Sequence, residues 1–382
     1  MKVCHVITRL ILGGAQENTI LTCEGLHARG HEVTLVTGPP LGPEGQLLER
    51  AQGGGYRVIV VDSLRREISP LRDRSARRAL VRLLRELAPD VMHSHSSKAG
   101  ILARKAAAQA GGIKIVHTVH GLPFHPYERR WRNRLYVALE RRAARRSDAI
   151  FSVADAMTAQ ALAAGVGRPE QYVTVYSGME VAPYLTRPAE ADAFRAGLRL
   201  PPEAVLVTQV SRLAELKGHE FILEAAGQID DARLHFCLVG DGALRGQIEA
   251  QIARRGLGER FRLTGLLPPE RIPAVMHATD ILVHCSLREG LARTLPQAML
   301  AGRPVVSFDV DGAREVVDAD TGILLPPGDV AGLKLAIQTL ASAAPLRQRL
   351  GAEGRRRCRE KFDHRRMVER IEAVYRRILA RG

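Results

Sequence analysis

The chain has 382 residues, of which 46% are hydrophobic and 25% are charged, a composition typical of globular proteins rather than disordered or fibrous ones. It is too long for one ordinary hydrophobic core, so we expect two domains. Its net charge of +15 suggests a polyanionic partner, and no run of about 18 apolar residues is found that would span a membrane.

The chain begins with MKVCHVITRL, in which polar residues interrupt the apolar run. This segment therefore predicts a buried strand and not a signal peptide. The five cysteines are scattered and form no CxxC pair. They indicate reduced thiols in a cytoplasmic protein.

Short β-branched runs alternate with amphipathic segments along the chain, which predicts α/β domains with parallel sheets. Strands are expected at 2–8, 32–37, 57–61, 90–93, 113–118, 149–153, 172–176, 204–210, 234–239, 261–264, 280–284, 304–307 and 322–325. Helices are expected at 15–29, 75–87, 98–110, 131–146, 217–227, 243–255, 293–301 and 331–341. The alternation restarts after a proline-interrupted connector near 180–200. We therefore predict two doubly wound domains with a cleft between them, and ligands at the C-terminal ends of the strands.

Two predicted strand-to-helix loops contain paired glycines. Gly13 and Gly14 allow the backbone to approach a ligand, and the N-terminus of the following helix offers N–H groups to an anion. A plain turn explains the two glycines equally well. Gly240 and Gly242 follow a buried strand. Arg245 stands where a GxGxxG fingerprint needs glycine, so this loop predicts a tight turn beside a nucleotide and not a dinucleotide fingerprint.

Two cations lie close together in VSRLAELKGHE, with Arg212 at a strand end and Lys217 at the start of the next helix. Cations oppose the dipole at a helix N-terminus, so we expect an anion to compensate them. A diphosphate would do so, with arginine as a forked contact and lysine as a point charge. Two solvated cations are the alternative.

The stretch SLREGLARTLPQAMLAGRPVV (286–306) places Glu289 and Gly290 in a loop whose amides open onto a helix beginning near Thr294. Together, these motifs resemble the retaining glycosyltransferases of family 4. The resemblance covers nearly the whole chain, through GGAQENT, VTLVTG, HTVHG, SRLAELKG, VGDGALR, TGLLP and EGLARTLPQAMLAGRPVV. It implies the GT-B fold, in which two Rossmann-like parallel-sheet domains face a central cleft. An acceptor domain is expected over 1–183, with a C-terminal helix at about 363–382 packing back on it, and a nucleotide-sugar domain over 184–362.

The resemblance also implies roles for individual residues. Arg212 and Lys217 would hold the diphosphate of a nucleotide sugar, Glu289 would contact hydroxyls of the donor sugar, and His120 would face the sugar and the β-phosphate; these four are the predicted catalytic residues. The predicted donor-binding residues are Gly13, Gly14, Gly240, Gly242, Gly290, Leu291, Ala292, Thr294 and Gln297. The leaving oxygen can take the acceptor proton, so we expect no protein base, and neither a metal ion nor another cofactor.

Gln297 departs from the family pattern, in which a second glutamate usually holds the ribose hydroxyls. Ribose needs a hydrogen-bond acceptor rather than a charge, and an amide oxygen is such an acceptor. We therefore expect activity to survive, with nucleotide affinity weaker by about 1–2 kcal/mol because a charged acceptor bonds more strongly. An inactive homologue is the alternative.

Two patterns could be mistaken for metal sites. His93 and His95 alternate on one strand face, but no carboxylate or cysteine accompanies them in motif order, so buried or cleft-lining histidines are favoured over zinc ligands. The sequence FDVDG (308–312) mimics an Asp-x-Asp metal motif. There we favour acceptor-side or loop-capping aspartates.

The positive charge is concentrated at the two ends of the sequence, with +10 over 1–183, −1 over 184–350 and +6 over 351–382. Within it, 128–146 holds eight arginines beside a partial apolar stripe that includes Trp131. This segment fits an interfacial helix attracted to anionic lipid, or a packed helix with a solvated basic face.

The sequence thus predicts a cytoplasmic glycosyltransferase (EC 2.4), peripheral at the inner face of the cell membrane. It would move a sugar, with retention, from a nucleotide sugar such as a UDP-sugar to a growing lipid-linked cell-surface glycan, as in polysaccharide or lipopolysaccharide synthesis. A nucleic-acid-binding protein would explain the charge, but no such motif is found and aromatic content is 4%, so no nucleic-acid partner is expected. An NAD-dependent oxidoreductase and a sugar-nucleotide epimerase of the same fold are further alternatives.

Overall fold

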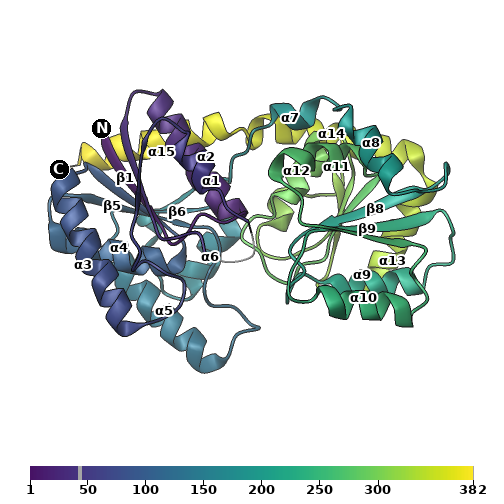
Figure 1. Cartoon of the computed structure of the whole chain (residues 1–382), viewed down its shortest axis with the longest axis horizontal. Helices are drawn as coiled ribbons and strands as arrows, with labels where there is room; N and C mark the ends of the chain where they lie inside the picture. Colours follow the sequence, from purple (N-terminus) through teal and green to yellow (C-terminus); the bar gives the residue numbers. More distant parts are fainter. Residues whose placement is uncertain (42–44, 382) are drawn as a thin grey trace. The chain divides into compact units, whose positions relative to one another are not determined.

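The computed structural model describes residues 1–41 and 45–381. The chain forms two compact units, unit 1 (Met1–Met179 and Asp363–Gly382) and unit 2 (Glu180–Phe362) (Figure 1). Residues 42–44 of the predicted N-terminal domain and Gly382, where the predicted C-terminal helix ends, lie outside the described residues. Within the described ranges, no helix is both long enough and apolar enough to cross a membrane.

Unit 1 is built on a seven-stranded sheet in the order β3-β2-β1-β4-β5-β6-β7, with every neighbouring pair parallel. Its strands are β1 (Lys2–Ile7), β2 (Glu32–Thr37), β3 (Arg57–Val60), β4 (Val91–His95), β5 (Lys114–Val119), β6 (Ala149–Ser152) and β7 (Tyr172–Thr174). Its helices are α1 (Gly14–Ala28), α2 (Leu48–Gln52), α3 (Pro70–Leu87), α4 (Ser97–Ala110), α5 (Arg130–Ala144), α6 (Asp155–Ala163), the 3-10 turn η1 (Pro169–Gln171) and α15 (His364–Leu379).

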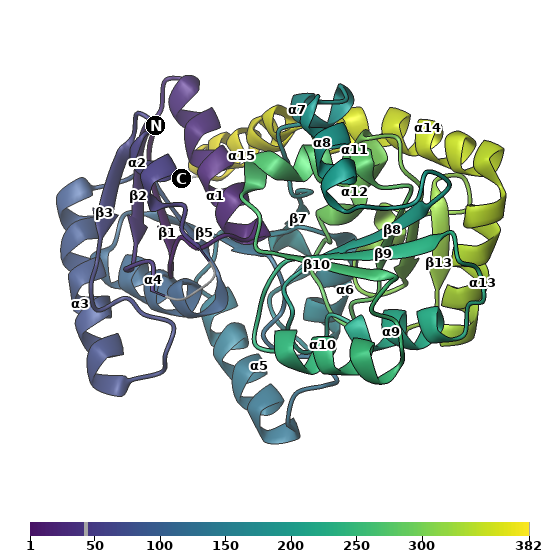
Figure 2. The ribbon, with the colours of Figure 1, turned by 45° about the vertical axis from the view of Figure 1, so that its right-hand side comes forward.

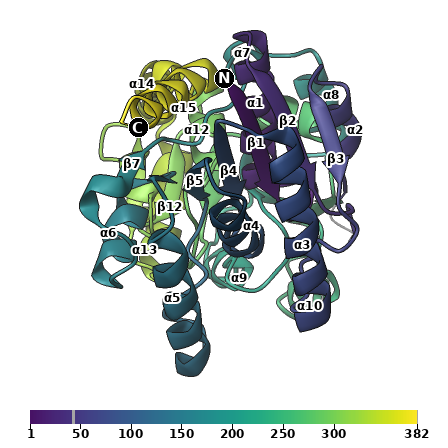
Figure 3. The same cartoon turned by 90° about the vertical axis from the view of Figure 1, so that its left-hand side faces the viewer.

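Helices cover both faces of this sheet, and its central strands are buried on both sides. On one face, Ile20 of α1 and Ile371 of α15 join the same core cluster, and the two helices lie side by side in Figure 1. On the other face, Leu80 of α3 and Ala103 of α4 pack over the strands. Helix α4 contacts α3 and also α5, and Figure 3 shows this side of the unit.

Unit 2 has a six-stranded sheet in the order β10-β9-β8-β11-β12-β13, again parallel throughout (Figure 2). Its strands are β8 (Val205–Val210), β9 (Leu234–Val239), β10 (Phe261–Gly265), β11 (Ile281–His284), β12 (Val305–Phe308) and β13 (Gly322–Leu325). Its helices are α7 (Ala182–Leu185), α8 (Glu190–Gly197), α9 (His219–Gly227), α10 (Arg245–Arg254), α11 (Ile272–Ala278), α12 (Thr294–Leu300), α13 (Val330–Ser342) and α14 (Ala344–Lys361), with the 3-10 turns η2 (Pro269–Arg271) and η3 (Ala313–Glu315).

The predicted doubly wound α/β architecture is confirmed, with a parallel sheet in each unit. The core of unit 2 joins α9, α10 and α13 to one face of its sheet through residues such as Ile222, Ile248 and Ile337. All five cysteines are buried and free of disulfide bonds.

Candidate active site

The order of strands in unit 2 reverses beside β8, since β9 and β10 follow on one side and β11 to β13 on the other. In a parallel sheet, the loops after β8, β9 and β11 leave from the same edge. Ligands of doubly wound sheets bind at such a switch point. The two predicted donor-side cations, Glu289 and the predicted glycines of unit 2 (Gly240, Gly242 and Gly290) all lie on these three loops.

The centre of this edge is an ion pair between two predicted catalytic residues. Lys217 Nζ lies 2.5 Å from Glu289 Oε1, and the same oxygen lies 3.3 Å from Nε2 of His284. Both charged side chains are less than a fifth exposed. Burial alone would raise the pKa of Glu289, but Lys217 and His284 outweigh it and hold that pKa well below its ordinary value. Glu289 is therefore a fixed carboxylate.

The loop that holds Glu289 is tied down from a neighbouring loop. The backbone N–H of Glu289 donates to Oδ2 of Asp311 at 2.6 Å, and Gly312 N–H donates to the carbonyl of Gly290 at 3.2 Å. Asp311 thus caps this loop, one of the two roles favoured for the FDVDG aspartates.

Two predictions about Lys217 are corrected by the structure, its position and its need for an external anion. Helix α9 begins at His219, so Lys217 lies in the loop before the helix and not at its start. The anion beside Lys217 is Glu289, so its charge alone does not require a diphosphate. Arg212 differs, because its side chain is exposed and no ion pair or hydrogen bond to it is found among the described residues.

The predicted donor-binding glycines of the β9–α10 loop have a structural reason for lacking a side chain. A Cβ on Gly240 would lie 2.1 Å from the carbonyl oxygen of Ser211, and one on Gly242 would lie 2.3 Å from that of Leu213. Leu213 N–H also donates to the Asp241 carbonyl at 3.0 Å. These glycines let the β9–α10 loop pack on the loop that carries Arg212.

The remaining donor-side residues surround the start of α12. Leu291 and Ala292 are buried at 7% and 6% exposure, and Gln297 inside α12 is 9% exposed. Thr294 is the first residue of α12, and its hydroxyl lies 3.5 Å from Nδ1 of His284. The predicted start of this helix near Thr294 is confirmed.

The other predicted residues belong to unit 1. Gly13 is the N-cap of α1 and Gly14 its first residue, directly after the loop that follows β1. His120 follows β5, and its Nε2 lies 3.1 Å from Nδ1 of His95. Both glycines and His120 therefore lie at or near the C-terminal edge of the unit 1 sheet, whose strands run parallel.

Sequence reasoning missed two histidines at this edge, one of which contacts the ion pair. His284 is the last residue of β11, five positions before Glu289, and its position at a strand end was the available signal. His219 is 2% exposed, and its Nε2 lies 3.1 Å from the hydroxyl of Ser211. Burial and the nearby charge of Lys217 lower the pKa of His219 to about 4.

Two family models together match most of the chain. Residues 13–178 match the model of the glycosyl transferase 4-like domain, and residues 190–357 match that of glycosyl transferases group 1. A 2-deoxystreptamine glucosyltransferase of Streptomyces kanamyceticus is 32% identical over 314 residues, which cover 79% of this chain and 81% of the relative.

Two further proteins are similar over most of their length. The UDP-Gal:alpha-D-GlcNAc-diphosphoundecaprenol alpha-1,3-galactosyltransferase of Escherichia coli is 27% identical over 336 residues, covering 86% of this chain and 85% of the relative. The crystal structure of Anabaena HepE in complex with UDP-glucose superposes with a TM-score of 0.84 at 24% identity and covers 98% of this chain and 99% of HepE. This likeness confirms the predicted GT-B fold.

Proposed function

Because the chain belongs to the retaining glycosyltransferases of family 4, which use nucleotide sugars, we propose that it transfers a sugar from a UDP-sugar to a lipid-linked glycan. Unit 2 would bind the donor and unit 1 the acceptor. Family membership excludes the three alternatives, a nucleic-acid-binding protein, an oxidoreductase and an epimerase. The observation that carries the proposal is the Lys217–Glu289–His284 cluster at the switch point of the unit 2 sheet.

The cluster suits the departure of a diphosphate. Arg212 is an exposed cation at the same edge, and Lys217 is held in place before any ligand binds. Fixed cations stabilise charge that develops on a leaving group without reorganising during the reaction. Glu289, ionised and anchored by its backbone, can accept hydrogen bonds from sugar hydroxyls.

Two relatives support the choice of donor and acceptor. HepE was crystallised with UDP-glucose, and the name of the Escherichia coli relative specifies UDP-Gal as donor and a diphosphoundecaprenol-linked sugar as acceptor. The Streptomyces kanamyceticus relative instead acts on 2-deoxystreptamine, whose amino groups are cationic at neutral pH. Unit 1 carries 32 Lys and Arg against 18 Asp and Glu, so it would repel a cationic acceptor and attract a diphosphate-linked one.

The test is transfer from a panel of radiolabelled UDP-, GDP- and ADP-sugars to synthetic diphospholipid-linked sugars and to 2-deoxystreptamine. We expect a labelled lipid product from a UDP-sugar, with the anomeric configuration of the donor retained. Transfer only to 2-deoxystreptamine would contradict the acceptor assignment. Transfer only from a GDP- or ADP-sugar would contradict the donor assignment.

Gln297 gives a prediction about the nucleotide. If its amide oxygen accepts from the ribose, Gln297→Leu should weaken UDP binding by about 1–3 kcal/mol because a buried donor loses its partner. Gln297→Glu should retain activity and bind UDP at least as tightly, since a charged acceptor bonds more strongly. Calorimetric titration with UDP measures both changes. A leucine variant with wild-type affinity would show that Gln297 only packs within α12.

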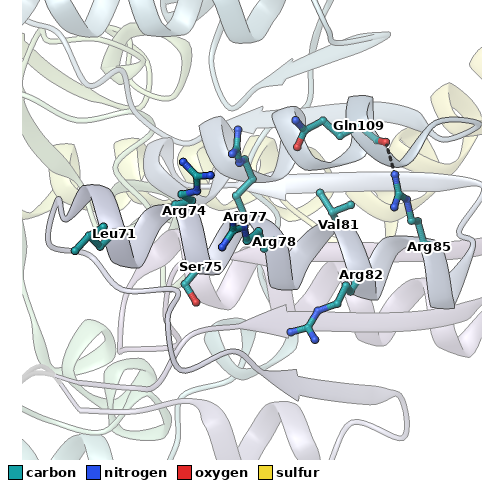
Figure 4. A pocket seen from close by; sticks show the side chains of 9 residues that line it. All are labelled: Leu71, Arg74, Ser75, Arg77, Arg78, Val81, Arg82, Arg85 and Gln109. Atoms are coloured by element: carbon teal, nitrogen blue, oxygen red, sulfur yellow. Dashed lines mark hydrogen bonds between the residues drawn. The ribbon is translucent and has the colours of Figure 1, made fainter.

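We further propose that unit 1 docks on an anionic membrane. Two sets of arginines line the helices on either side of α4, and Figure 4 shows the first of them along α3. They are Arg74, Arg77, Arg78, Arg82 and Arg85 on α3, and Arg141, Arg142, Arg145 and Arg146 at the C-terminal end of α5.

The charges of both sets reach α4, which lies between them. The pKa of Lys105 on α4 is lowered by Arg77 of α3 first, and also by Arg142 of α5 and by Arg146 just beyond its end. Apolar side chains lie exposed near the N-terminal ends of the same helices, with Leu71 at 84% one turn before Arg74 and Trp131 at 59% beside Arg132. Clustered cations beside exposed apolar groups match a bilayer of anionic lipid, where each Lys or Arg adds about 1 kcal/mol near the surface.

The protein should therefore bind liposomes that contain anionic lipid and not purely zwitterionic ones, and salt should weaken the binding. Replacing Arg141, Arg142, Arg145 and Arg146 by glutamine should release it, as measured by liposome co-sedimentation. The double variant Arg142→Gln, Arg145→Gln should bind more weakly. Its matched control is the double variant Arg254→Gln, Arg255→Gln at the C-terminal end of α10, which should bind normally. Equal partition onto both kinds of liposome, or none at low salt, would contradict the docking proposal.

A further inference from the structure

Unit 1 contains a row of three hydrogen-bonded histidines that ends at a predicted catalytic residue. Nδ1 of His5 on β1 lies 3.0 Å from Nε2 of His95 on β4, and Nδ1 of His95 lies 3.1 Å from Nε2 of His120. The first two rings are fully buried and stacked, with centroids 5.3 Å apart. The family comparison assigns no role to His5 or His95.

The buried members of the row are neutral. Burial lowers the pKa of His5 to about 3 and lowers that of His95 well below its ordinary value, with help from the neighbouring histidines. A neutral imidazole has one N–H donor and one acceptor nitrogen. Both nitrogens of His95 are used in the row, so one must donate and the other accept. The N–H groups along the row must therefore all point the same way.

The far end of the row determines that direction. Nε2 of His5 is buried and has no hydrogen-bond partner among the described residues. An unpaired buried N–H is rarer in proteins than an unpaired acceptor, so the single proton of His5 belongs on Nδ1, where it is bonded. His95 Nε2 then accepts, and His95 Nδ1–H donates to Nε2 of His120.

We infer that His5 and His95 are positioning residues that fix the tautomer of His120, with its proton on Nδ1. A neutral His120 in this tautomer carries its N–H on Nδ1 and accepts on Nε2, so the row sets which of its two nitrogens can donate. The inference rests on the proposed role of His120 in sugar transfer. It also accounts for buried histidines on β1 and β4 without a metal ion, although His5, His93 and His95 bring possible ligand atoms within 4.8 Å of one another.

His93 packs against the rings of the row, with its centroid 4.2 Å from that of His95, but it bonds to other residues. Its Nδ1 lies 2.5 Å from the hydroxyl of Tyr375, and its Nε2 lies 2.7 Å from that of Thr118. Both nitrogens are thus occupied within unit 1, and they would have to give up these bonds to bind an ion. The bonds favour the hydrogen-bonded row over the zinc alternative.

The experiment measures the tautomer of His120 directly by long-range ¹H–¹⁵N NMR of protein labelled at histidine, with the His120→Gln variant to assign the signal. In the wild-type protein we expect the proton on Nδ1. In His95→Leu, which removes the donor, we expect a mixture of tautomers. The kcat for sugar transfer should fall roughly tenfold to a hundredfold, the scale for losing a partner that orients a histidine, with less change in the donor KM.

Two variants separate positioning from packing. His95→Asn retains an N–H near the place of Nδ1 and should restore much of the kcat. His117→Leu removes another buried histidine, bonded to Ser94, and should leave the His120 tautomer unchanged.

Two results would overturn the inference. One is a His120 proton on Nε2 in the wild-type protein, and the other is a folded His95→Leu variant with the wild-type tautomer and kcat. If His95→Leu does not fold, the wild-type tautomer alone decides. A wild-type protein that transfers no sugar refutes the proposed function, whereas the tautomer measurement still tests the row.

Discussion

Replacing Arg212 or Lys217 by alanine should lower kcat by roughly 10²–10³-fold, the scale of losing one preorganised group that stabilises developing charge. The two residues should differ in how they act. Arg212 is exposed, so its loss removes a contact to the diphosphate and little else. Loss of Lys217 also takes from the largely buried carboxylate of Glu289 its lysine partner, so this variant should be less stable as well.

Arg245→Ala is the matched control for both. Arg245 is a cation at the same edge of the sheet, but it is paired with Asp241 at 3.2 Å and Glu249 at 2.9 Å. Its loss should change kcat by less than about twofold, since exposed pairs contribute little. Near-wild-type kcat in folded Arg212→Ala and Lys217→Ala would remove the proposed diphosphate site.

Glu289→Gln should lower kcat by roughly 10²-fold or more, because the variant keeps the shape of the side chain but loses the charge that both Lys217 and sugar hydroxyls would bond. UDP should still bind, since the proposed contact is to the sugar. Sugar transfer and UDP titration together measure this split. Equal loss of UDP affinity and of kcat would place Glu289 at the nucleotide instead. Glu249→Gln on α10 is the control.

The same variant has a predictable effect of pH on stability. Lys217 and His284 depress the pKa of Glu289, so the ionised carboxylate stabilises the fold above the ordinary glutamate pKa and this contribution is lost as pH falls toward the depressed value. The difference in unfolding free energy between wild type and Glu289→Gln should therefore shrink below a pH of about 4.5. A difference that stays constant down to pH 3 would contradict the depressed pKa.

The strand pattern was predictable because parallel strands buried on both faces read as short apolar runs bounded by turns. The helix over 344–361 was not, because Gly351 and Gly354 interrupt its pattern. The structure shows why glycine stands there. A Cβ on Gly351 would lie 2.0 Å from the carbonyl oxygen of Gly302, so α14 needs glycine to pack on the segment after α12. Periodicity carries no information about such close approaches.

The site was predictable only in part. Spacing and resemblance assigned Arg212, Lys217 and Glu289 to one donor site, but the 72 positions that separate Lys217 from Glu289 hid their ion pair. The row of histidines was hidden for the same reason, because His5 and His95 are 90 positions apart and meet only through the pairing of β1 with β4. Contacts that depend on sheet order follow from the fold and not from local sequence.

The central claim is that the loops after β8, β9 and β11 bind the diphosphate of a UDP-sugar, and calorimetric titration of UDP and of uridine tests it most directly. Wild-type protein should bind UDP at least about tenfold more tightly than uridine, a difference of about 1.4 kcal/mol that reports the diphosphate. In Arg212→Ala that difference should largely vanish while uridine affinity stays the same. Equal affinity of wild type for UDP and uridine, or an undiminished preference for UDP in Arg212→Ala, would contradict the account.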